Sequence, residues 1–299
     1  MATAKEIKGK MGSVKSTQKI TRAMELIAAS KMRGARHRME MVRPYAESAR
    51  QIIRHVAKSH PEYRHPYLAS SRKLEGASSS TSVGLILVST DRGLCGGLNI
   101  NLFREVTRVL SRLKQTKVNV KVAALGQKAQ NFIRQCDVDV LAARAHLGDK
   151  PKLPDVMGSV QVMLEAFDTG AIQELYLFSN AFVSTVKQQP YQSKLLPIDQ
   201  LEDLPPSSEE EPYWDYLYEP EAKKVLEQLF KRYIESQVYQ GVIENIACEQ
   251  AARILAMKNA TDNAGKMLQD LKLKYNKARQ AAITQELAEI VSGADAQTN

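Results

Sequence analysis

The chain has 299 residues, of which 43% are hydrophobic and 25% charged, and its formal net charge is +9. This is the composition of an ordinary globular protein that is long enough for one or two hydrophobic cores. An integral membrane protein is excluded, because no apolar run approaches the roughly 20 residues of a membrane span, and from the charged N-terminus we expect no secretory signal.

The cysteines indicate the redox environment of the protein, and the distribution of charge indicates the kind of partner that it binds. Cys95, Cys136 and Cys248 are odd in number and far apart, which favours reduced thiols over a disulfide framework or a zinc site. Residues 1–58 contain fourteen Lys and Arg but only four acidic residues, so one terminal segment carries the imbalance. A basic segment of this kind indicates an acidic partner.

Proline placement predicts three segments. All eleven prolines lie between Pro44 and Pro220, and a ring without an N–H is costly inside a helix, so both ends of the chain are predicted to be long helices. We expect coiled-coil helices over residues 1–58 and 221–299, with a globular domain over residues 59–220 between them.

The N-terminal segment carries a seam of apolar residues that repeat every 3.5 positions. This spacing predicts coiled-coil packing against another helix. The seam consists of Ala28, Met32, Ala35, Met39, Val42, Ala46, Ala49, Ile53 and Val56, with Ile7, Met11 and Val14 on its backward extension. Polar residues interrupt it at Gln18, Thr21 and Glu25. Pro44 lies off the seam, so the helix either kinks there and continues or ends there.

A second apolar stripe lies on another face of the same helix. It consists of Ile20, Met24 and Ile27. A stripe away from the seam predicts a second contact surface.

Between the helices the apolar pattern changes to that of an α/β domain. Buried strands are predicted at 83–88, 118–125 and 174–178, with further strands at 182–186 and 193–198. Amphipathic helices are predicted at 98–113, 127–135 and 155–167. The alternation of strands and helices indicates a Rossmann-like sheet of parallel strands.

An acidic loop at 199–221, with nine acids, four prolines and no basic residue, precedes the last helix. The 3.5-residue seam then returns from Leu226 to Ala282, and a different stripe follows near the end. That stripe is Ile283, Leu287 and Ile290. At about 1.5 Å per residue, the C-terminal helix is longer than the N-terminal one by roughly 25 Å, so its end is predicted to overhang an antiparallel pair.

The most enzyme-like run is the glycine-rich turn from Ser89 to Asn99. Such a turn can hold phosphate on backbone N–H groups, but this one lacks the Gly-Lys-Ser/Thr of a P-loop and the G-x-G-x-x-G of a dinucleotide fold. We interpret it as a tight turn that serves the fold or a partner contact. Cys95 has no adjacent base and the five histidines lack ligand spacing, so no catalytic residue, cofactor or metal ligand is predicted.

Two alternative functions stay open on these residues. The first is an α/β nucleotide-binding enzyme that its helices merely oligomerise, which would bind ATP or NAD without other subunits. The second is a nucleic-acid binder that uses the basic helix and holds DNA in a salt-dependent way. The seam already commits one face of that helix to a partner, and aromatic residues are not interleaved with its cations. We therefore favour an acidic protein surface as the partner, and no nucleic acid.

Several runs of sequence resemble the hallmarks of a known family. Ile283 to Ala296 fits the signature of the gamma subunit of F-type ATP synthases at every fixed place. Gln18 to Met24, Ala29 to Arg33 and Ser89 to Asn99 resemble the other hallmark runs of that family. The resemblance covers essentially the full chain, and in this family the subunit is the rotor of the central stalk.

The resemblance implies a rotor that is not itself an enzyme. It would couple proton-driven turning of the c ring to conformational cycling of the catalytic beta subunits, and so to ATP synthesis or, in reverse, hydrolysis. The implied partners are an α3β3 hexamer, the epsilon subunit and the c-subunit ring, with membrane contact only through that ring. The chain lacks the cysteine-bearing insertion of the chloroplast form, and we expect no presequence. The resemblance then implies a bacterial protein at the cytoplasmic side of the inner membrane, with a processed mitochondrial chain as the alternative.

Individual residues also gain implied roles from the resemblance. Contacts to the beta subunits are implied for Arg22, Met24, Lys31, Arg33, Arg36, Arg253, Arg279 and Gln280. The stripe of Ile283, Leu287 and Ile290 would turn in the apolar bearing of the hexamer. Tyr216, Tyr218 and Glu219 resemble the foot that meets the c ring. Counting equal steps along the helices from residues 56 and 221 places Met24 opposite Arg253.

Overall fold

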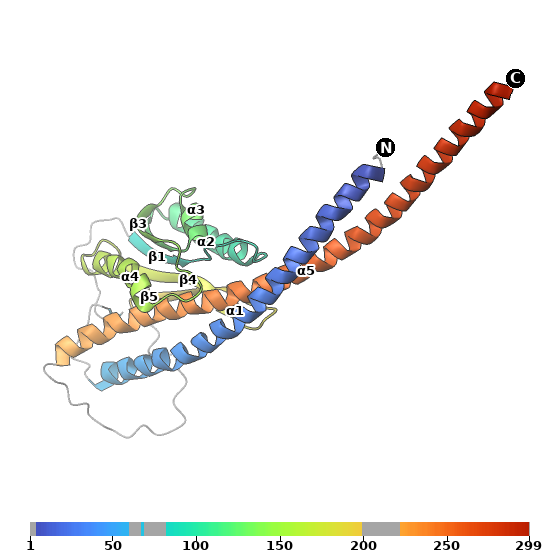
Figure 1. The fold of residues 1–299 in the computed structure, drawn as a ribbon. Coiled ribbons are helices and arrows are strands. Elements are labelled where there is room, and N and C mark those ends of the chain that lie inside the picture. Colours follow the sequence, from blue (N-terminus) through green and yellow to red (C-terminus); the bar gives the residue numbers. More distant parts are fainter. Residues whose placement is uncertain (1–3, 60–66, 69–81, 199–221, 299) are drawn as a thin grey trace. The chain divides into compact units, whose positions relative to one another are not determined.

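The computed structural model describes residues 4–59, 67–68, 82–198 and 222–298 (Figure 1). Contacts between residues divide the chain into two units, one formed by Met1–Ala29 with Arg253–Asn299 and the other by Ser30–Ala252. The terminal helices α1 (Ala4–Ser59) and α5 (Ala222–Thr298) each contribute residues to both units. The three segments predicted from the sequence follow the chain instead, and that division stays a prediction.

The larger unit contains one five-stranded sheet in the order β3-β2-β1-β4-β5. Its strands are β1 (Ser82–Val88), β2 (Asn119–Leu125), β3 (Asp139–Arg144), β4 (Glu174–Phe182) and β5 (Gln188–Leu196). Neighbouring strands are parallel except β5, which runs antiparallel to β4. Every residue of the central strand β1 is buried, as expected for a strand that is covered on both faces. The predicted Rossmann-like α/β domain is confirmed.

Two strand predictions differ from the structure. The predicted strand at 182–186 is wrong, because Phe182 ends β4 and residues 183–187 form the turn into β5. Val183 and Val186 are 56% and 71% exposed in that turn, so apolar residues there do not report burial. The predicted strand at 193–198 is the second half of β5. β3 has no counterpart among the predicted strands, because its apolar run, residues 140–143, is only four residues long, and so short a run does not distinguish a strand from part of a helix.

Helices cover both faces of the sheet. α2 (Leu98–Gln115) and α3 (Gln127–Ile133) pack on one face through a core that includes Leu102, Val106 and Ile133. α4 (Leu153–Asp168) lies on the opposite face, where a Cβ added at Gly84 of β1 would lie 2.8 Å from the methyl carbon of Met163. The helix approaches this closely because the strand has no side chain at that position. The three predicted helices are confirmed with bounds that differ by at most two residues.

In the smaller unit α1 and α5 form an antiparallel pair. The hydroxyl oxygens of Thr21 and Thr261 lie 2.8 Å apart, and Gln18 lies beside Thr261 and Gly265. Residue numbers thus fall along α1 while they rise along α5. The buried and half-buried positions along this part of α1 include the predicted seam with its polar members: Ile7, Met11, Val14, Gln18, Thr21, Glu25 and Ala28. α1 is continuous through Pro44, so the proline does not end the helix.

The register of this pair differs from the one counted from residues 56 and 221. With Thr21 level with Thr261, Met24 lies level with Met257 and Lys258. The placement of Met24 opposite Arg253 is therefore wrong by about five residues, or a little more than one helical turn. Counting from residues 56 and 221 assumes that these two residues lie level with each other. The side-chain contacts between α1 and α5 set the register instead.

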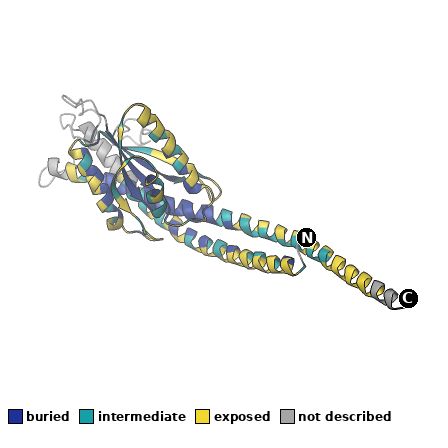
Figure 2. Ribbon diagram, turned by 90° about the horizontal axis from the view of Figure 1, so that it is seen from above, coloured by how far each residue is buried: buried dark blue, intermediate teal, exposed yellow. Residues whose placement is uncertain are grey.

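The end of α5 extends beyond α1. By the same register Ala4 lies level with Ala278, so about twenty residues of α5, roughly 30 Å, follow the last pairing position. Every side chain from Arg279 to Val291 is exposed (Figure 2). The predicted overhang is confirmed. Ala282, which continues the predicted seam, is exposed because the pairing has already ended.

Candidate functional site

The glycine-rich turn from Ser89 to Asn99 is stabilised by its own side chains. Asn99 Nδ2 donates to Thr90 Oγ1 at 2.7 Å, and Thr90 Oγ1 donates to the Arg92 carbonyl oxygen at 2.7 Å. Thr90 and Asn99 are buried, so these polar groups satisfy one another inside the fold. This supports the interpretation of a turn that serves the fold.

Asp91 of the same turn binds backbone N–H groups of two neighbouring segments. Its carboxylate accepts hydrogen bonds from the backbone N–H groups of Gln127 at 3.0 Å, His146 at 2.9 Å and Gly148 at 3.3 Å. Gln127 is the first residue of α3, and the free N–H groups at a helix start are the usual ligands of an anion. The Asp91 carboxylate therefore attaches the turn to the start of α3 and to residues 146–148, which is a role in the fold.

The thiols are buried rather than activated. Cys95 and Cys248 lie in one buried cluster with Leu98 and Ala252. Burial, and next the nearby Glu244 carboxylate, raise the pKa of Cys248 far above its usual value. Burial also raises the pKa of the half-buried Cys136. Because the thiolate is the reactive form, neither of these two groups is poised as a nucleophile at neutral pH.

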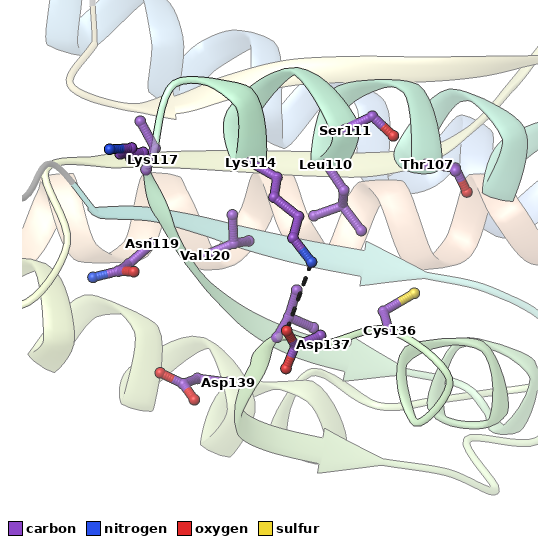
Figure 3. Close-up of a pocket in the computed structure, with 12 residues that line it drawn as sticks. Thr107, Leu110, Ser111, Lys114, Lys117, Asn119, Val120, Cys136, Asp137 and Asp139 are labelled. Atoms are coloured by element: carbon purple, nitrogen blue, oxygen red, sulfur yellow. Dashed lines mark ion pairs between the residues drawn. The ribbon is translucent and has the colours of Figure 1, made fainter.

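A groove of about 570 Å³ lies between the C-terminal end of α2 and the starts of β2 and β3 (Figure 3). Lys114 Nζ and Asp137 Oδ2 lie 3.7 Å apart in it, and the two side chains are 80% and 97% exposed. Cys136 also lines the groove. Binding sites for small molecules need a few fixed polar groups in a mostly apolar, enclosed pocket, and ion pairs this exposed are weak. The groove does not form a catalytic site.

The part of the chain that the structure describes contains neither a metal-ligand cluster nor a membrane-spanning helix. No group of three or more His, Cys, Asp or Glu residues there is arranged to hold a metal ion. None of the described helices is both long enough and apolar enough to cross a membrane.

The predicted contact residues of α1 are cations at or near the surface. Arg22 lies in the smaller unit, and Lys31, Arg33 and Arg36 lie in the larger one. Arg22 pairs with Glu25 at 3.2 Å, Lys31 with Asp149 at 2.7 Å and Arg36 with Glu40 at 2.9 Å. All three pairs are partly or largely exposed, and such pairs contribute less than about 1 kcal/mol each.

Arg33 differs from the other three cations of α1. It is exposed, and no carboxylate among the described residues pairs with it. Its positive charge therefore faces the solvent without compensation from within the described part of the chain.

Met24 and Arg253 both lie in the smaller unit but differ in access. Met24 is half-buried, and its stripe partners Ile20 and Ile27 are exposed. Arg253 is only 9% exposed and takes part in interactions within the chain. Of the predicted contact residues on the two helices, Arg253 is thus the one with the least accessible surface.

The end of α5 presents the remaining predicted residues. Arg279 and Gln280 are exposed just beyond the last pairing position. Ile283, Leu287 and Ile290 are 48%, 57% and 67% exposed, although they are large apolar side chains. Tyr216, Tyr218 and Glu219, predicted as the foot, lie outside the described residues.

Sequence reasoning missed two residues near these surfaces. Asp149 pairs with Lys31, and its carbonyl oxygen accepts a hydrogen bond from Arg38 at 2.9 Å. A separation of 118 residues along the chain gives no signal for that contact. Leu26 is 61% exposed beside Ile27, and its position off the apolar seam was the available signal.

Sequence comparisons relate the chain to known proteins over its whole length. A family model described as ATP synthase matches residues 3–297. The ATP synthase gamma chain of Nitrosococcus oceani is 55% identical over 297 residues, which cover 99% of this chain and 100% of that protein.

Solved structures with the same fold come from ATP synthase complexes. A chain of the central stalk and c ring of the Tetrahymena thermophila mitochondrial ATP synthase matches with a TM-score of 0.55 and 20% identity, over 81% of this chain and 99% of that one. A chain of the Euglena gracilis mitochondrial ATP synthase, in a structure of OSCP, F1 and c ring, matches with a TM-score of 0.54 and 19% identity, over 92% and 95%. At this level of identity the likeness concerns the fold.

Proposed function

Because the chain belongs to the ATP synthase gamma-chain family, and is thus a non-catalytic rotor subunit, we propose that exposed surfaces of α1 and α5 are the parts that act on its partners. The partners are the α3β3 hexamer, the epsilon subunit and the c-subunit ring. As the c ring turns the subunit, different faces of the two helices meet each beta subunit in succession. A ligand shifts a conformational equilibrium only by its differential affinity for the states, and these helix faces are the differential ligand.

The observation that carries this proposal is the set of cations on α1. Arg33 has no carboxylate partner among the described residues, and Lys31 and Arg36 are held only by weak pairs with water access. An acidic segment of a beta subunit that comes within a few ångströms of Arg33 can bind it and compete for Arg36, which lies about 60° from Arg33 around the helix, whereas Lys31 lies about 160° away. The basic excess of the N-terminal segment then has the acidic partner that its charge requires.

The apolar residues outside the seam supply the other proposed contacts. Met24, Ile20 and Ile27, all in the smaller unit, contact the beta subunits. Arg253 is a second, less accessible contact on α5, about five residues from the level of Met24. Arg279 and Gln280 engage a beta subunit further along α5. Ile283, Leu287 and Ile290 then enter an apolar sleeve of the hexamer, which gives an exposed apolar stripe the burial it lacks in the chain itself.

ATP synthase is a membrane-associated complex, and we place this rotor at the cytoplasmic side of a bacterial inner membrane. The 55% identity to the chain from Nitrosococcus oceani supports the bacterial setting. Contact with the membrane would occur only through the c ring, with Tyr216, Tyr218 and Glu219 as the proposed foot.

Co-purification tests the proposed partners. The tagged chain, expressed with the other subunits of the complex, should purify as a single copy per α3β3 hexamer together with epsilon. A chain that purifies alone, or that binds ATP or NAD with micromolar affinity without the other subunits, would contradict the proposal.

A charge reversal tests the α1 surface. Arg33→Glu should lower ATP-driven proton pumping by the assembled complex, because it places a carboxylate where an acidic partner is expected, whereas Arg33→Lys should pump normally. Arg108→Glu is a matched control, since Arg108 is a similarly exposed arginine on α2 of the same unit. Equal rates of proton pumping by the Arg33→Glu and Arg108→Glu complexes would show that Arg33 does not contact a beta subunit.

A further inference from the structure

A buried polar contact attaches α5 to β4 within the larger unit. Asn180 Nδ2 donates to Asn245 Oδ1 at 2.8 Å, and both residues are 1% exposed. The backbone N–H of Phe182 donates to Glu244 Oε1 at 2.8 Å, and the Cys248 thiol donates to the Asn180 carbonyl oxygen at 3.4 Å. These three hydrogen bonds join one short stretch of α5 to the last residues of β4.

The same stretch of α5 approaches the strand closely. Gly241, one helical turn before Asn245, faces Leu177 and Ser179 of β4, and a Cβ added to it would lie 3.1 Å from Leu177 Cδ2. Glycine is a poor helix former, so helix propensity does not explain its presence in the middle of α5. The close approach of helix and strand explains it.

The polar contact is an inefficient source of stability. Asn180 Oδ1 is buried and accepts no hydrogen bond from the described residues. A buried amide atom without a partner costs free energy, and apolar side chains of similar volume would avoid that cost. Directional hydrogen bonds supply what apolar packing does not, which is one preferred rotation and axial position of the helix.

We propose that Asn180, Asn245 and Glu244 are positioning residues that fix the rotation of α5 about its own axis on the sheet, so that torque passes between sheet and helix without slip. The proposal rests on the rotor function given above. Residues 244–248 of α5 belong to the larger unit with β4, so these hydrogen bonds set the direction in which the side chains of that part of α5 point from the sheet. A roll of about 100°, the angle between successive residues, would replace the Asn245 amide with a neighbouring side chain at Asn180.

Paired leucine substitutions separate positioning from stability. Asn245→Leu leaves the Asn180 amide buried without an acceptor, so the Tm of the isolated chain should fall. Asn180→Leu with Asn245→Leu removes both amides, and the Tm should recover at least in part. In the complex reconstituted into liposomes, we expect the number of protons pumped per ATP hydrolysed to fall about twofold or more in both variants, because both lack the directional contact.

A purely structural role of the amide pair predicts a different pattern. Protons pumped per ATP would then follow the Tm, with a loss in Asn245→Leu and recovery in the double variant, and that result would overturn the proposal. A wild-type ratio in both variants would overturn it as well. Val106→Ala in the α2 core serves as a stability control, because it removes buried methyl groups away from α5 and should lower the Tm with an unchanged ratio.

Glu244 provides a second test if the double variant does not assemble. Glu244→Gln keeps an oxygen that accepts from the Phe182 N–H and should pump normally, whereas Glu244→Leu should lower the number of protons pumped per ATP. Equal ratios in these two variants would overturn the positioning role alone. A wild-type complex that hydrolyses ATP without pumping protons would instead overturn the rotor function on which the proposal rests.

Discussion

The hydroxyl oxygens of Thr21 and Thr261 lie 2.8 Å apart between α1 and α5, at the seam of the smaller unit. Either hydroxyl can donate to the other, and the donor that remains has a carbonyl within its own helix, Gln18 for Thr21 at 3.0 Å or Met257 for Thr261 at 2.8 Å. A polar layer in an apolar coiled-coil seam specifies register at some cost in stability. This pair therefore sets which residues of the two helices lie level.

Replacing both threonines by valine should loosen that register without destabilising the pair. Thr21→Val with Thr261→Val keeps the side-chain shape and leaves no hydroxyl unpaired, so the free energy of unfolding should change by less than about 1 kcal/mol or increase. Disulfide formation between Val14→Cys and Leu268→Cys, which lie level in the present register, measures the effect. The cross-link yield should fall in the valine variant, and an unchanged yield would show that the apolar seam alone fixes the register.

Truncations at two positions of α5 should differ in stability. Deletion of the residues after Ala288 removes only helix beyond the pairing with α1, so the thermal midpoint of the isolated chain should stay close to that of the full chain. Deletion after Ala260 also removes Thr261 and the half-buried seam residues that follow it, and should lower the midpoint by several degrees. An equal loss of folding or assembly in both truncations would contradict the overhang.

Met24→Lys should impair coupling more than folding. The new cation would lie level with Lys258, on a face where a beta subunit is proposed to bind. Met24 is only half-buried, so the free energy of unfolding should change by about 1 kcal/mol or less. Met24→Leu is the matched apolar control. Normal ATP-driven proton pumping in the lysine variant would count against a beta contact at this level.

The thiols should react in the order of their access to solvent. Cys136 is half-buried and should be labelled by a maleimide in the native chain, whereas the buried Cys95 and Cys248 should be labelled only on unfolding. Because the pKa of Cys136 is raised from 9.0, its thiolate fraction and its labelling rate should still increase above pH 9. Mass spectrometry of each labelled peptide gives the labelling rates. Rapid labelling of Cys248 in the native chain would contradict the burial of the contact between α5 and β4.

Elements that carry their own burial pattern could be predicted from the sequence. β1 is apolar throughout because both of its faces are covered, and the seams of α1 and α5 repeat over many turns. β3 could not be predicted, because its four-residue apolar run at 140–143 is too short to distinguish a strand from part of a helix. The register between α1 and α5 could not be predicted either, because it depends on a contact between residues 240 positions apart in the chain.

In the candidate surfaces too, features with a local sequence pattern could be predicted, and contacts between distant segments could not. The basic excess of α1 could be found from its composition, and the apolar stripe at the end of α5 could be found because it lies off the seam, whereas the individual contact residues came from the family resemblance. The Asp149 partner of Lys31 and the burial of Arg253 arise from segments distant in sequence, which composition and periodicity do not report. The contact between Asn180 and Asn245 belongs to the same class.

The stripe of Ile283, Leu287 and Ile290 also affects the solubility of the chain before it assembles with its partners. These side chains lie in water on newly made protein, where hydration of apolar surface is unfavourable in proportion to its area. Their spacing of four and three residues suits pairing with an identical helix, so two free copies can cover the stripe tail to tail. A cell that makes more of this chain than of the α3β3 hexamer should therefore accumulate dimers and precipitated chain. Production of all subunits in matching amounts keeps the chain in solution, because the hexamer then covers the stripe.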